Sequence, residues 1–398
     1  MISHNGNYKK TTRRVLSRRG VLWLGQTCNL RCHFCYFLDR VKHKDHPEHA
    51  FMSFDKARSI CSTLVDVYGN RAIDIQGGEP TIYPEINELV THCRTIGLLP
   101  SLITNAIVLH RKDVCRQLKD AGVRDLLISI HGLGQTYEDV VGVPGTHAKQ
   151  MEALENCAEI GIPFRFNCVL AKSILPDLER VAKLALDTGA RVVNFITFNP
   201  FEDQQNKKRS LANVPTYSEV KEPLTAALKL LASRGVECNV RYLPFCMLDE
   251  EFRPNIYDFQ QLPYDLHEWD YASWSWTGQS QQRNKPSALT PPPTLRQANT
   301  HSGLFGKPGY LDDASITTAE EYRHSALIRA REHCKYKYDE RCVSCAAHDI
   351  CDGFNGDYAE LFGAAEAAPI SGDKIDDPLH YAQRQIKIVE KDDYDWAS

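Results

Sequence analysis

Residues 20–35 read GVLWLGQTCNLRCHFC, a short apolar run followed at once by three closely spaced cysteines. The run is rich in branched residues and ends at a glycine, which predicts a buried β-strand over residues 21–25. Cys28, Cys32 and Cys35 follow it, with three and then two residues between them. Three thiolates in one short loop suit an iron–sulfur cluster or zinc, because thiolate is a soft ligand. A structural zinc site normally needs four ligands, and this loop offers only three good ones.

Outward from this loop, the chain up to residue 243 alternates between strand-like and helix-like segments. Short apolar runs predict strands at 21–25, 72–76, 101–104, 125–130, 164–170, 192–198 and 237–242. Apolar residues three and four apart predict helices at 53–67, 84–96, 112–121, 148–160, 178–187 and 217–233. Strands separated by helices imply an α/β fold with a parallel sheet, either doubly wound or curled towards a barrel. Ligands are then expected at the carboxyl ends of the strands.

Composition excludes several classes of protein. The chain has 398 residues, of which 42% are hydrophobic and 25% charged, values typical of a globular protein with a sizeable core. Its 47 basic and 51 acidic residues give a net charge of −4, which argues against a nucleic-acid coat or a polybasic membrane binder. No apolar run reaches the roughly 18 residues of a membrane span, and residues 1–19 lack the apolar core of a signal peptide. We therefore expect a cytoplasmic protein without a membrane partner.

The cysteine count points to metal chemistry. Fourteen cysteines in a chain without a secretion signal favour metal binding or redox chemistry, because disulfides are uncommon in reducing compartments. Half of them are grouped: Cys28, Cys32 and Cys35 near the start, and Cys334, Cys342, Cys345 and Cys351 near the end. Most of the scattered cysteines are expected to pack as small apolar residues.

A second motif, Gly77-Gly78-Glu79-Pro80, stands at the end of the second predicted strand. Together with Cys28-x3-Cys32-x-Phe34-Cys35 after the first strand, it resembles the radical S-adenosylmethionine (radical SAM) superfamily. The order of the two motifs, their positions at strand ends and the β/α alternation behind them all carry the resemblance.

The resemblance implies a partial (βα)6 barrel that holds a [4Fe-4S] cluster on Cys28, Cys32 and Cys35 and binds S-adenosylmethionine. Reductive cleavage of that molecule would yield a 5′-deoxyadenosyl radical. It also implies that Gly77, Gly78, Glu79 and Pro80 bind the methionine amino group, and that Phe34 packs near the adenine. Further cofactor-binding candidates are Thr104, Asn105 and Ser129, at the ends of later strands, and Asn167, on the fifth predicted strand. Two roles are open for His131: an acid or base at the site, or a structural residue.

The C-terminal group resembles the auxiliary-cluster extension of the SPASM and twitch branches of this superfamily. Cys342, Cys345 and Cys351 would hold a second [4Fe-4S] cluster, and Asn355 stands about where the full SPASM pattern has another cysteine. This departure favours the shorter, twitch-like version. It leaves the fourth ligand open between Cys334, Cys246 and a substrate atom. The alternative is a zinc site, because a CxxC pair with two more thiols also suits zinc.

The predicted organisation has four parts. Residues 1–19 form a basic arm, read as a solvated leader, and residues 20–243 form the barrel. Residues 244–316 form an irregular linker or lid region, because periodicity disappears there. Residues 317–398 form the auxiliary-cluster extension and a polar tail, which is expected to lie on the surface.

The function that follows is hydrogen-atom abstraction from a polar small-molecule or nucleotide-like substrate, giving an oxidation or an isomerisation. The electrons would come from a donor such as flavodoxin or ferredoxin. Maturation of a ribosomal peptide and modification of a nucleic-acid base are alternatives within the same chemistry. An alternative from another class is a non-catalytic iron–sulfur electron carrier or a zinc scaffold.

Overall fold

The computed structural model describes residues 9–11, 19–35, 50–66, 70–200, 211–261 and 335–389. In this part of the chain no helix is long and apolar enough to cross a membrane. The expected helix leading into the second cysteine group, most of the 244–316 region and Cys334 lie outside the described residues.

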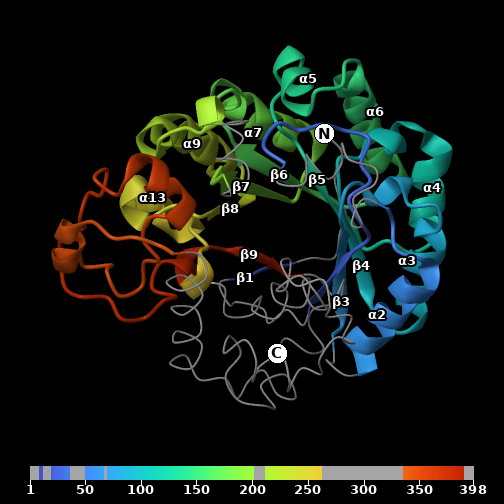
Figure 1. Cartoon of the computed structure of the whole chain (residues 1–398), viewed down its shortest axis with the longest axis horizontal. Helices are drawn as coiled ribbons and strands as arrows, with labels where there is room; N and C mark the ends of the chain where they lie inside the picture. The colour runs from blue at the N-terminus through green and yellow to red at the C-terminus, as the bar shows by residue number, and fades with distance from the viewer. Residues whose placement is uncertain are drawn as a thin grey trace.

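Seven parallel strands form one curved sheet, and their order in the sheet is their order in the chain (Figure 1). All seven coincide with the strands predicted from the sequence, to within two residues at either end. The strands are β2 (Arg19–Trp23), β3 (Ala72–Gln76), β4 (Leu99–Thr104), β5 (Asp125–Ser129), β6 (Phe164–Leu170), β7 (Val192–Thr197) and β8 (Glu237–Arg241). The α/β class with a parallel sheet is therefore confirmed, and β2 and β8 form the two edges.

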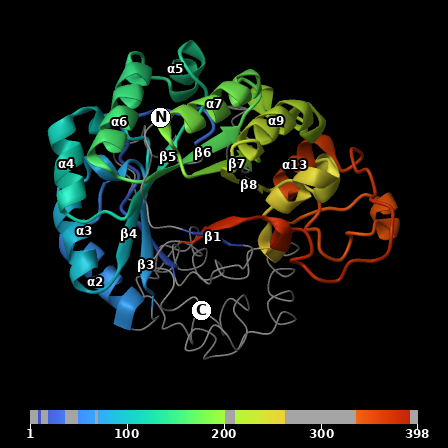
Figure 2. The same ribbon diagram turned by 180° about the vertical axis from the view of Figure 1, so that it is seen from behind.

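Helices cover the convex face of the sheet (Figures 1 and 2). The six predicted ones are α2 (Phe54–Asp66), α3 (Ile86–Thr95), α4 (Lys112–Asp120), α6 (Thr146–Ile160), α7 (Leu178–Thr188) and α9 (Tyr217–Ala232). A seventh helix, α5 (Gln135–Val141), was not predicted and lies between β5 and α6. Short 3-10 helices occupy Pro80–Ile82, Ile107–His110, Leu175–Asp177, Leu211–Asn213, Phe245–Met247, Glu250–Asn255, Phe259–Gln261, Glu340–Ser344 and Ala382–Arg384.

Strand β6 shows how the sequence builds two different faces. Successive side chains of a strand point to opposite faces of the sheet. Phe164, Phe166 and Leu170 are buried in the core against the helices. Arg165 and Asn167, which alternate with them, line a cavity on the concave face. The apolar face thus anchors the helices, and the polar face is left to line the site.

The C-terminal segment packs beside the β8 edge of the sheet, next to α9 (Figures 1 and 2). It contains α13 (Gly356–Phe362), whose Tyr358 ring stacks on Tyr217 of α9 with 3.7 Å between ring centroids. The carboxylate of Asp352 accepts hydrogen bonds from the backbone of Phe259 at 2.7 Å and from the side chain of Gln260 at 3.0 Å. These buried contacts tie the extension to the barrel.

Both chain ends differ from their predictions. Strand β1 (Lys9–Thr11) pairs antiparallel with β9 (Lys387–Val389), so this part of the basic arm is not a solvated leader. The tail was expected on the surface, but Lys387 and Ile388 line the cavity on the concave face of the sheet. The prediction failed because the partners of this segment are far away in sequence, while its own composition is polar.

Candidate active site

The three N-terminal cysteines lie in the loop that follows β2. All three thiols are half-buried and face one cavity of about 560 Å³. Backbone hydrogen bonds hold the loop to α5, from Arg31 N to Val141 O at 2.8 Å and from His33 N to Val140 O at 3.1 Å. These bonds fix the shape of the loop.

Two thiols of this loop, those of Cys28 and Cys32, are uncharged on their own. Burial raises the pKa of Cys28 to about 12, with the charge of Glu79 adding to the effect. Burial also raises the pKa of Cys32 well above its usual range, and the neighbouring thiols of Cys35 and Cys28 raise it further. Three thiols in one loop become thiolates together only when a cationic centre compensates their charge. The donor set therefore fits a metal cluster.

Gly77 and Gly78 allow the loop after β3 to dock against the loop after β2. A Cβ atom on Gly78 would lie 2.0 Å from the backbone oxygen of Thr27, and one on Gly77 would lie 2.5 Å from that of Gly25. The docking is completed by hydrogen bonds from Gly78 N to Gly25 O at 2.7 Å and from Glu79 N to Thr27 O at 2.9 Å. The resemblance implied that both glycines contact a bound ligand. In the structure, the group that they approach is the neighbouring loop.

Glu79 is a buried acceptor that joins two loops. Its carboxylate accepts hydrogen bonds from the backbone and hydroxyl of Thr81 at 2.9 and 2.6 Å, from the hydroxyl of Thr104 at 2.5 Å, and from Asn105 N at 2.7 Å. Burial raises the pKa of Glu79, and these donors oppose that effect. Three of the four bonds reach Oε1, so Oε2 is the oxygen with acceptor capacity left for a ligand.

Thr104, Asn105 and Ser129 line the cavity at the ends of β4 and β5, as the strand-end rule predicts. The Asn105 side chain donates to Asn29 Oδ1 in the cysteine loop at 2.7 Å. Gln150 of α6, a residue the sequence analysis did not identify, donates to the backbone oxygens of Asn105 and Ser129 at 2.9 Å each. These bonds fix the two strand ends relative to each other.

Phe34 and His131 form an aromatic wall of the cavity, with ring centroids 4.6 Å apart in an edge-on arrangement. Val169 N donates to His131 Nδ1 at 3.3 Å, which assigns the remaining proton to Nε2. Burial lowers the pKa of His131 to about 3, and His33 lowers it further. His131 is therefore a neutral hydrogen-bonding group near neutral pH, which argues against its use as a general base.

Polar side chains continue along the inner face of the later strands, away from the cysteines. Asp74, Asn194, Asn239 and Arg241 line the cavity, together with Arg165, which makes a two-point ion pair with Asp125 at 2.9 and 3.1 Å. A lumen of this kind is suited to a polar ligand, because buried polar groups need hydrogen-bond partners.

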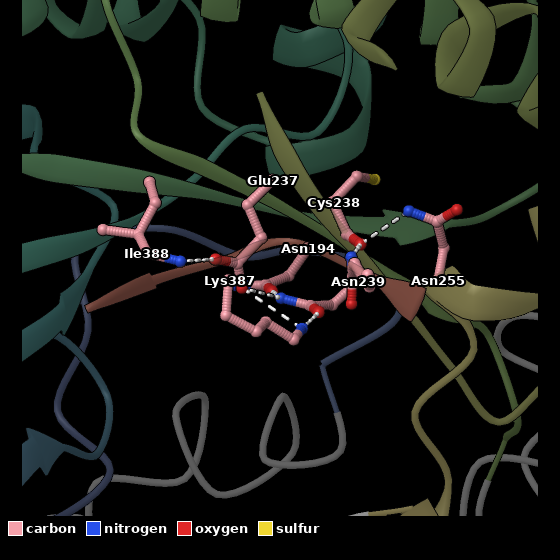
Figure 3. A network of polar contacts seen from close by, with 8 residues as sticks. Asn194, Glu237, Cys238, Asn239, Asn255, Lys387 and Ile388 are labelled. Carbon is pink, nitrogen blue, oxygen red and sulfur yellow. Dashed lines mark hydrogen bonds and ion pairs between the residues drawn. The ribbon is translucent and has the colours of Figure 1, made fainter. Parts of the chain in front are cut away.

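The tail lies against β8 at one side of the cavity, where Lys387 and Ile388 contact side chains of that strand (Figure 3). Lys387 Nζ lies 3.2 Å from Glu237 Oε1, 2.5 Å from Asn239 Oδ1 and 3.7 Å from the centre of the Tyr257 ring. Ile388 N donates to Glu237 Oε2 at 2.6 Å. Burial opposes ionisation of Glu237, but the charge of Lys387 and the Ile388 N–H together lower its pKa. Both side chains are therefore charged, and the ion pair joins the tail to β8.

The second cysteine group converges on a separate, small cavity. Cys342, Cys345 and Cys351 line it together with Cys246, which lies in the 3-10 helix shortly after β8. Burial raises the pKa of Cys246, and the nearby thiols of Cys342 and Cys345 raise it further. The structure places Cys246 with these three thiols, and Cys334, the other cysteine considered for the fourth position, lies outside the described residues.

Of the residues predicted to hold the N-terminal cluster and S-adenosylmethionine, all but one therefore line the large cavity. Pro80 is buried at the start of a 3-10 helix and does not line the cavity. Proline has no N–H and favours the first helical position, which accounts for its place there. The cavity is also lined by residues that were not predicted from the sequence, among them Tyr137, Glu237, Tyr257 and Lys387.

Residues 24–185 match the model of the Radical SAM superfamily. A relative from Rhodopseudomonas palustris, "PqqA peptide cyclase", is 30% identical over 218 residues, which cover 54% of this chain and 55% of that protein. "Probable GTP 3',8-cyclase" from Sulfurisphaera tokodaii is 24% identical over 237 residues, which cover 59% and 67%. The crystal structure of Streptococcus suis SuiB bound to S-adenosylmethionine is similar with a TM-score of 0.47 at 16% identity, covering 57% of this chain and 50% of that one. The chain spans about half the length of the curated relatives it matches.

Proposed function

Because residues 24–185 match the model of the Radical SAM superfamily, we propose that the chain is a member of this superfamily, an enzyme that abstracts a hydrogen atom from a polar small-molecule or nucleotide-like substrate. Bound at the three N-terminal cysteines, a reduced [4Fe-4S] cluster would supply the electron that cleaves S-adenosylmethionine to the abstracting radical. The reaction is an oxidation or an isomerisation, depending on whether an electron leaves the substrate after the abstraction. A flavodoxin-like or ferredoxin-like donor and a cytoplasmic location belong to the same proposal.

One observation carries the proposal: the cysteine loop, the Gly77–Glu79 loop and the ends of β4 and β5 all face one cavity. In this arrangement Cys28, Cys32 and Cys35 would hold the cluster and leave one iron free for a ligand. Glu79 Oε2 and the strand-end groups Thr104, Asn105 and Ser129 would orient S-adenosylmethionine beside it. Phe34 and His131 would cover the apolar faces of the bound molecule and exclude water.

The substrate class follows from the other half of the cavity. Side chains from β3, β6, β7 and β8 present amides and charges of both signs to it. Acidic groups (Asp74 and Glu237) face basic ones (Arg165, Arg241 and Lys387), so the cavity has no single dominant charge. This favours a polar, hydrogen-bonding substrate over an apolar one or a polyanion.

The C-terminal cysteines support an auxiliary cluster. Four thiols surround one cavity. We propose that Cys246, Cys342, Cys345 and Cys351 are its ligands. A single zinc ion would need the four sulfur atoms to meet at one point.

A peptide substrate is the second candidate. It is favoured by the relative named "PqqA peptide cyclase", whereas the nucleotide-like reading is favoured by the one named "Probable GTP 3',8-cyclase". A peptide substrate predicts that a short precursor reading frame lies beside the gene and that this peptide stimulates turnover.

The test is anaerobic reconstitution followed by metal analysis and a product assay. Wild-type protein should hold about eight irons, as expected for two [4Fe-4S] clusters, and should form 5′-deoxyadenosine with reductant and S-adenosylmethionine. Cys32→Ala should abolish the product and retain about four irons. Cys168→Ala is the matched control, because Cys168 is buried on the outer face of β6 and does not line the cavity. Zinc without iron in the wild-type protein, or full product formation by Cys32→Ala, would overturn the proposal.

A further inference from the structure

Tyr137 is a buried polar residue at the active-site cavity that the proposed function does not use. It lies on α5, its side chain is fully buried, and it lines the cavity with Cys28 and Cys32. Its hydroxyl has no hydrogen-bond partner among the described residues. A buried hydroxyl without a hydrogen-bond partner destabilises the fold unless a bound ligand supplies that partner.

Helix α5 sets the distance between Tyr137 and the cysteine loop. The carbonyl oxygens of Val140 and Val141, one turn after Tyr137, accept the backbone hydrogen bonds from His33 and Arg31. The contact is tight, since a Cβ atom on Gly142 would lie 3.3 Å from the backbone oxygen of Arg31. The helix that holds the loop in place therefore also carries the unpartnered hydroxyl.

The surroundings of Tyr137 specify what its partner must be. The acidic groups that act on it most strongly are Cys32, Glu79 and Cys28, in that order. The four hydrogen bonds that Glu79 accepts come from Thr81, Thr104 and Asn105, and none comes from Tyr137. A phenol beside two cysteine ligands is a donor that lacks an acceptor, and thiolate and sulfide sulfur are acceptors.

We propose that the Tyr137 hydroxyl donates a hydrogen bond to a sulfur atom of the cluster assembly at Cys28, Cys32 and Cys35, and so raises its reduction potential. The inference rests on the proposed function, because it needs a cluster at these cysteines. Hydrogen bonds to cluster sulfur stabilise the more negative, reduced state, which makes reduction easier. Tyr137 is thus a positioning and tuning residue.

The test is a redox titration of the reconstituted protein followed by electron paramagnetic resonance, without S-adenosylmethionine. The cluster at Cys28, Cys32 and Cys35 is identified by the signal that the wild-type protein shows and Cys32→Ala lacks. In Tyr137→Phe this cluster should titrate at a more negative potential, at unchanged iron and sulfide content and unchanged thermal stability of the fold. Electron–nuclear spectroscopy in deuterated and ordinary buffer should also show one exchangeable proton coupled to the wild-type cluster and absent from Tyr137→Phe.

Tyr83→Phe is the matched control. Tyr83 is also buried with an unpartnered hydroxyl among the described residues, but it packs on Phe51 and does not line the cavity. An unshifted potential in Tyr137→Phe, or a shift of equal size in Tyr83→Phe, would overturn the inference. The inference would also be overturned if Tyr137→Phe changed only the affinity for S-adenosylmethionine, because the hydroxyl would then donate to that molecule and not to the cluster. Failure of the proposed function is distinguished by the wild-type protein, which would then hold no cluster to titrate.

Discussion

At the scale of single residues, Glu79 shows that a motif residue can do more than contact a ligand. Its carboxylate binds the Gly77–Glu79 loop to the end of β4 through Thr104 and Asn105. The same carboxylate then has one oxygen with capacity left towards the cavity. The residue is therefore both a structural joint of the site and a candidate contact for an ammonium group.

Glu79→Gln tests both roles, because it keeps the size of the side chain but removes its charge and one acceptor oxygen. The amide is nearly the same size, but its NH2 group must face donors that now lack an acceptor. We expect a loss of about 1–3 kcal/mol in the free energy of unfolding and at least a tenfold weaker dissociation constant for S-adenosylmethionine. Urea unfolding and equilibrium binding measure the two effects. Glu88→Gln, at an exposed position of α3, is the control and should change neither; equal behaviour of the two variants would contradict the assignment.

His131 predicts a pH dependence of stability. Its pKa is about 3 in the folded chain and about 6.5 when unfolded, so between these values only the unfolded chain binds the proton. Acidification through this window therefore destabilises the fold. Between pH 7.5 and 5.5 the residue should remove about 1 kcal/mol of stability.

The variant that tests this is His131→Asn, whose side-chain oxygen can still accept from Val169 N. Anaerobic urea unfolding at both pH values should show a smaller loss for the variant than for the wild-type protein. If both proteins lose the same free energy of unfolding between pH 7.5 and pH 5.5, His131 is not held neutral by burial.

At the scale of elements, the sequence predicts those strands and helices that a local pattern of residues determines. The seven strands were predictable because each alternates or clusters its apolar residues over its own length. Helix α5 was missed because it has only seven residues and no side-chain cap at its N-terminus. Strand β9 was missed because it pairs with Lys9–Thr11, at the other end of the chain.

The site residues also divide into those that a local motif identifies and those that only tertiary packing brings to the cavity. Motif spacing identified the cysteines and the Gly77–Glu79 loop. Strand ends identified Thr104, Asn105 and Ser129, and a polar position within a strand identified Asn167. Tyr137 and Lys387 were missed because tertiary packing brings them to the cavity. Cys246 stayed one of three options until folding placed it beside Cys342, Cys345 and Cys351.

The attachment of β9 to β8 can be tested through Lys387. Lys387→Met leaves the buried carboxylate of Glu237 without its cation, which should cost about 2–4 kcal/mol of stability at pH 7. Because the pKa of Glu237 is lowered in the fold, the ion pair stabilises above the unfolded pKa near 4.5 and is lost as the pH falls through the folded value. The stability difference between wild type and variant should therefore shrink on acidification.

Lys183→Met is the control for this prediction, because its ion pair with Asp187 on α7 is exposed. Its effect should stay within about 0.5 kcal/mol. Replacing both Lys387 and Glu237, by methionine and glutamine, should recover part of the lost stability, since no unpaired charge is then buried. A Lys387→Met variant as stable as wild type at pH 7 would show that β9 is not attached in this way.

At the scale of the whole molecule, the second cysteine group joins two parts of the chain. Cys246 follows the last strand of the sheet, and the other three thiols belong to residues 335–389. A cluster held by all four would cross-link the barrel and the extension, in addition to the Tyr217–Tyr358 stack and the Asp352 hydrogen bonds. Metal binding at such a site contributes directly to folding stability.

Cys246→Ala tests whether the fourth ligand comes from the barrel. The variant should lose about four of about eight irons and should have a lower melting temperature than wild type when both are reconstituted, but nearly the same one when both are metal-free. Cys238→Ala is the control, because Cys238 is a buried thiol of β8 that lies outside the small cavity. A full iron content in Cys246→Ala would assign the fourth position to another group. A stability loss of the same size with and without metal would reduce Cys246 to a packing residue, because a ligand stabilises the fold only through the metal that it binds.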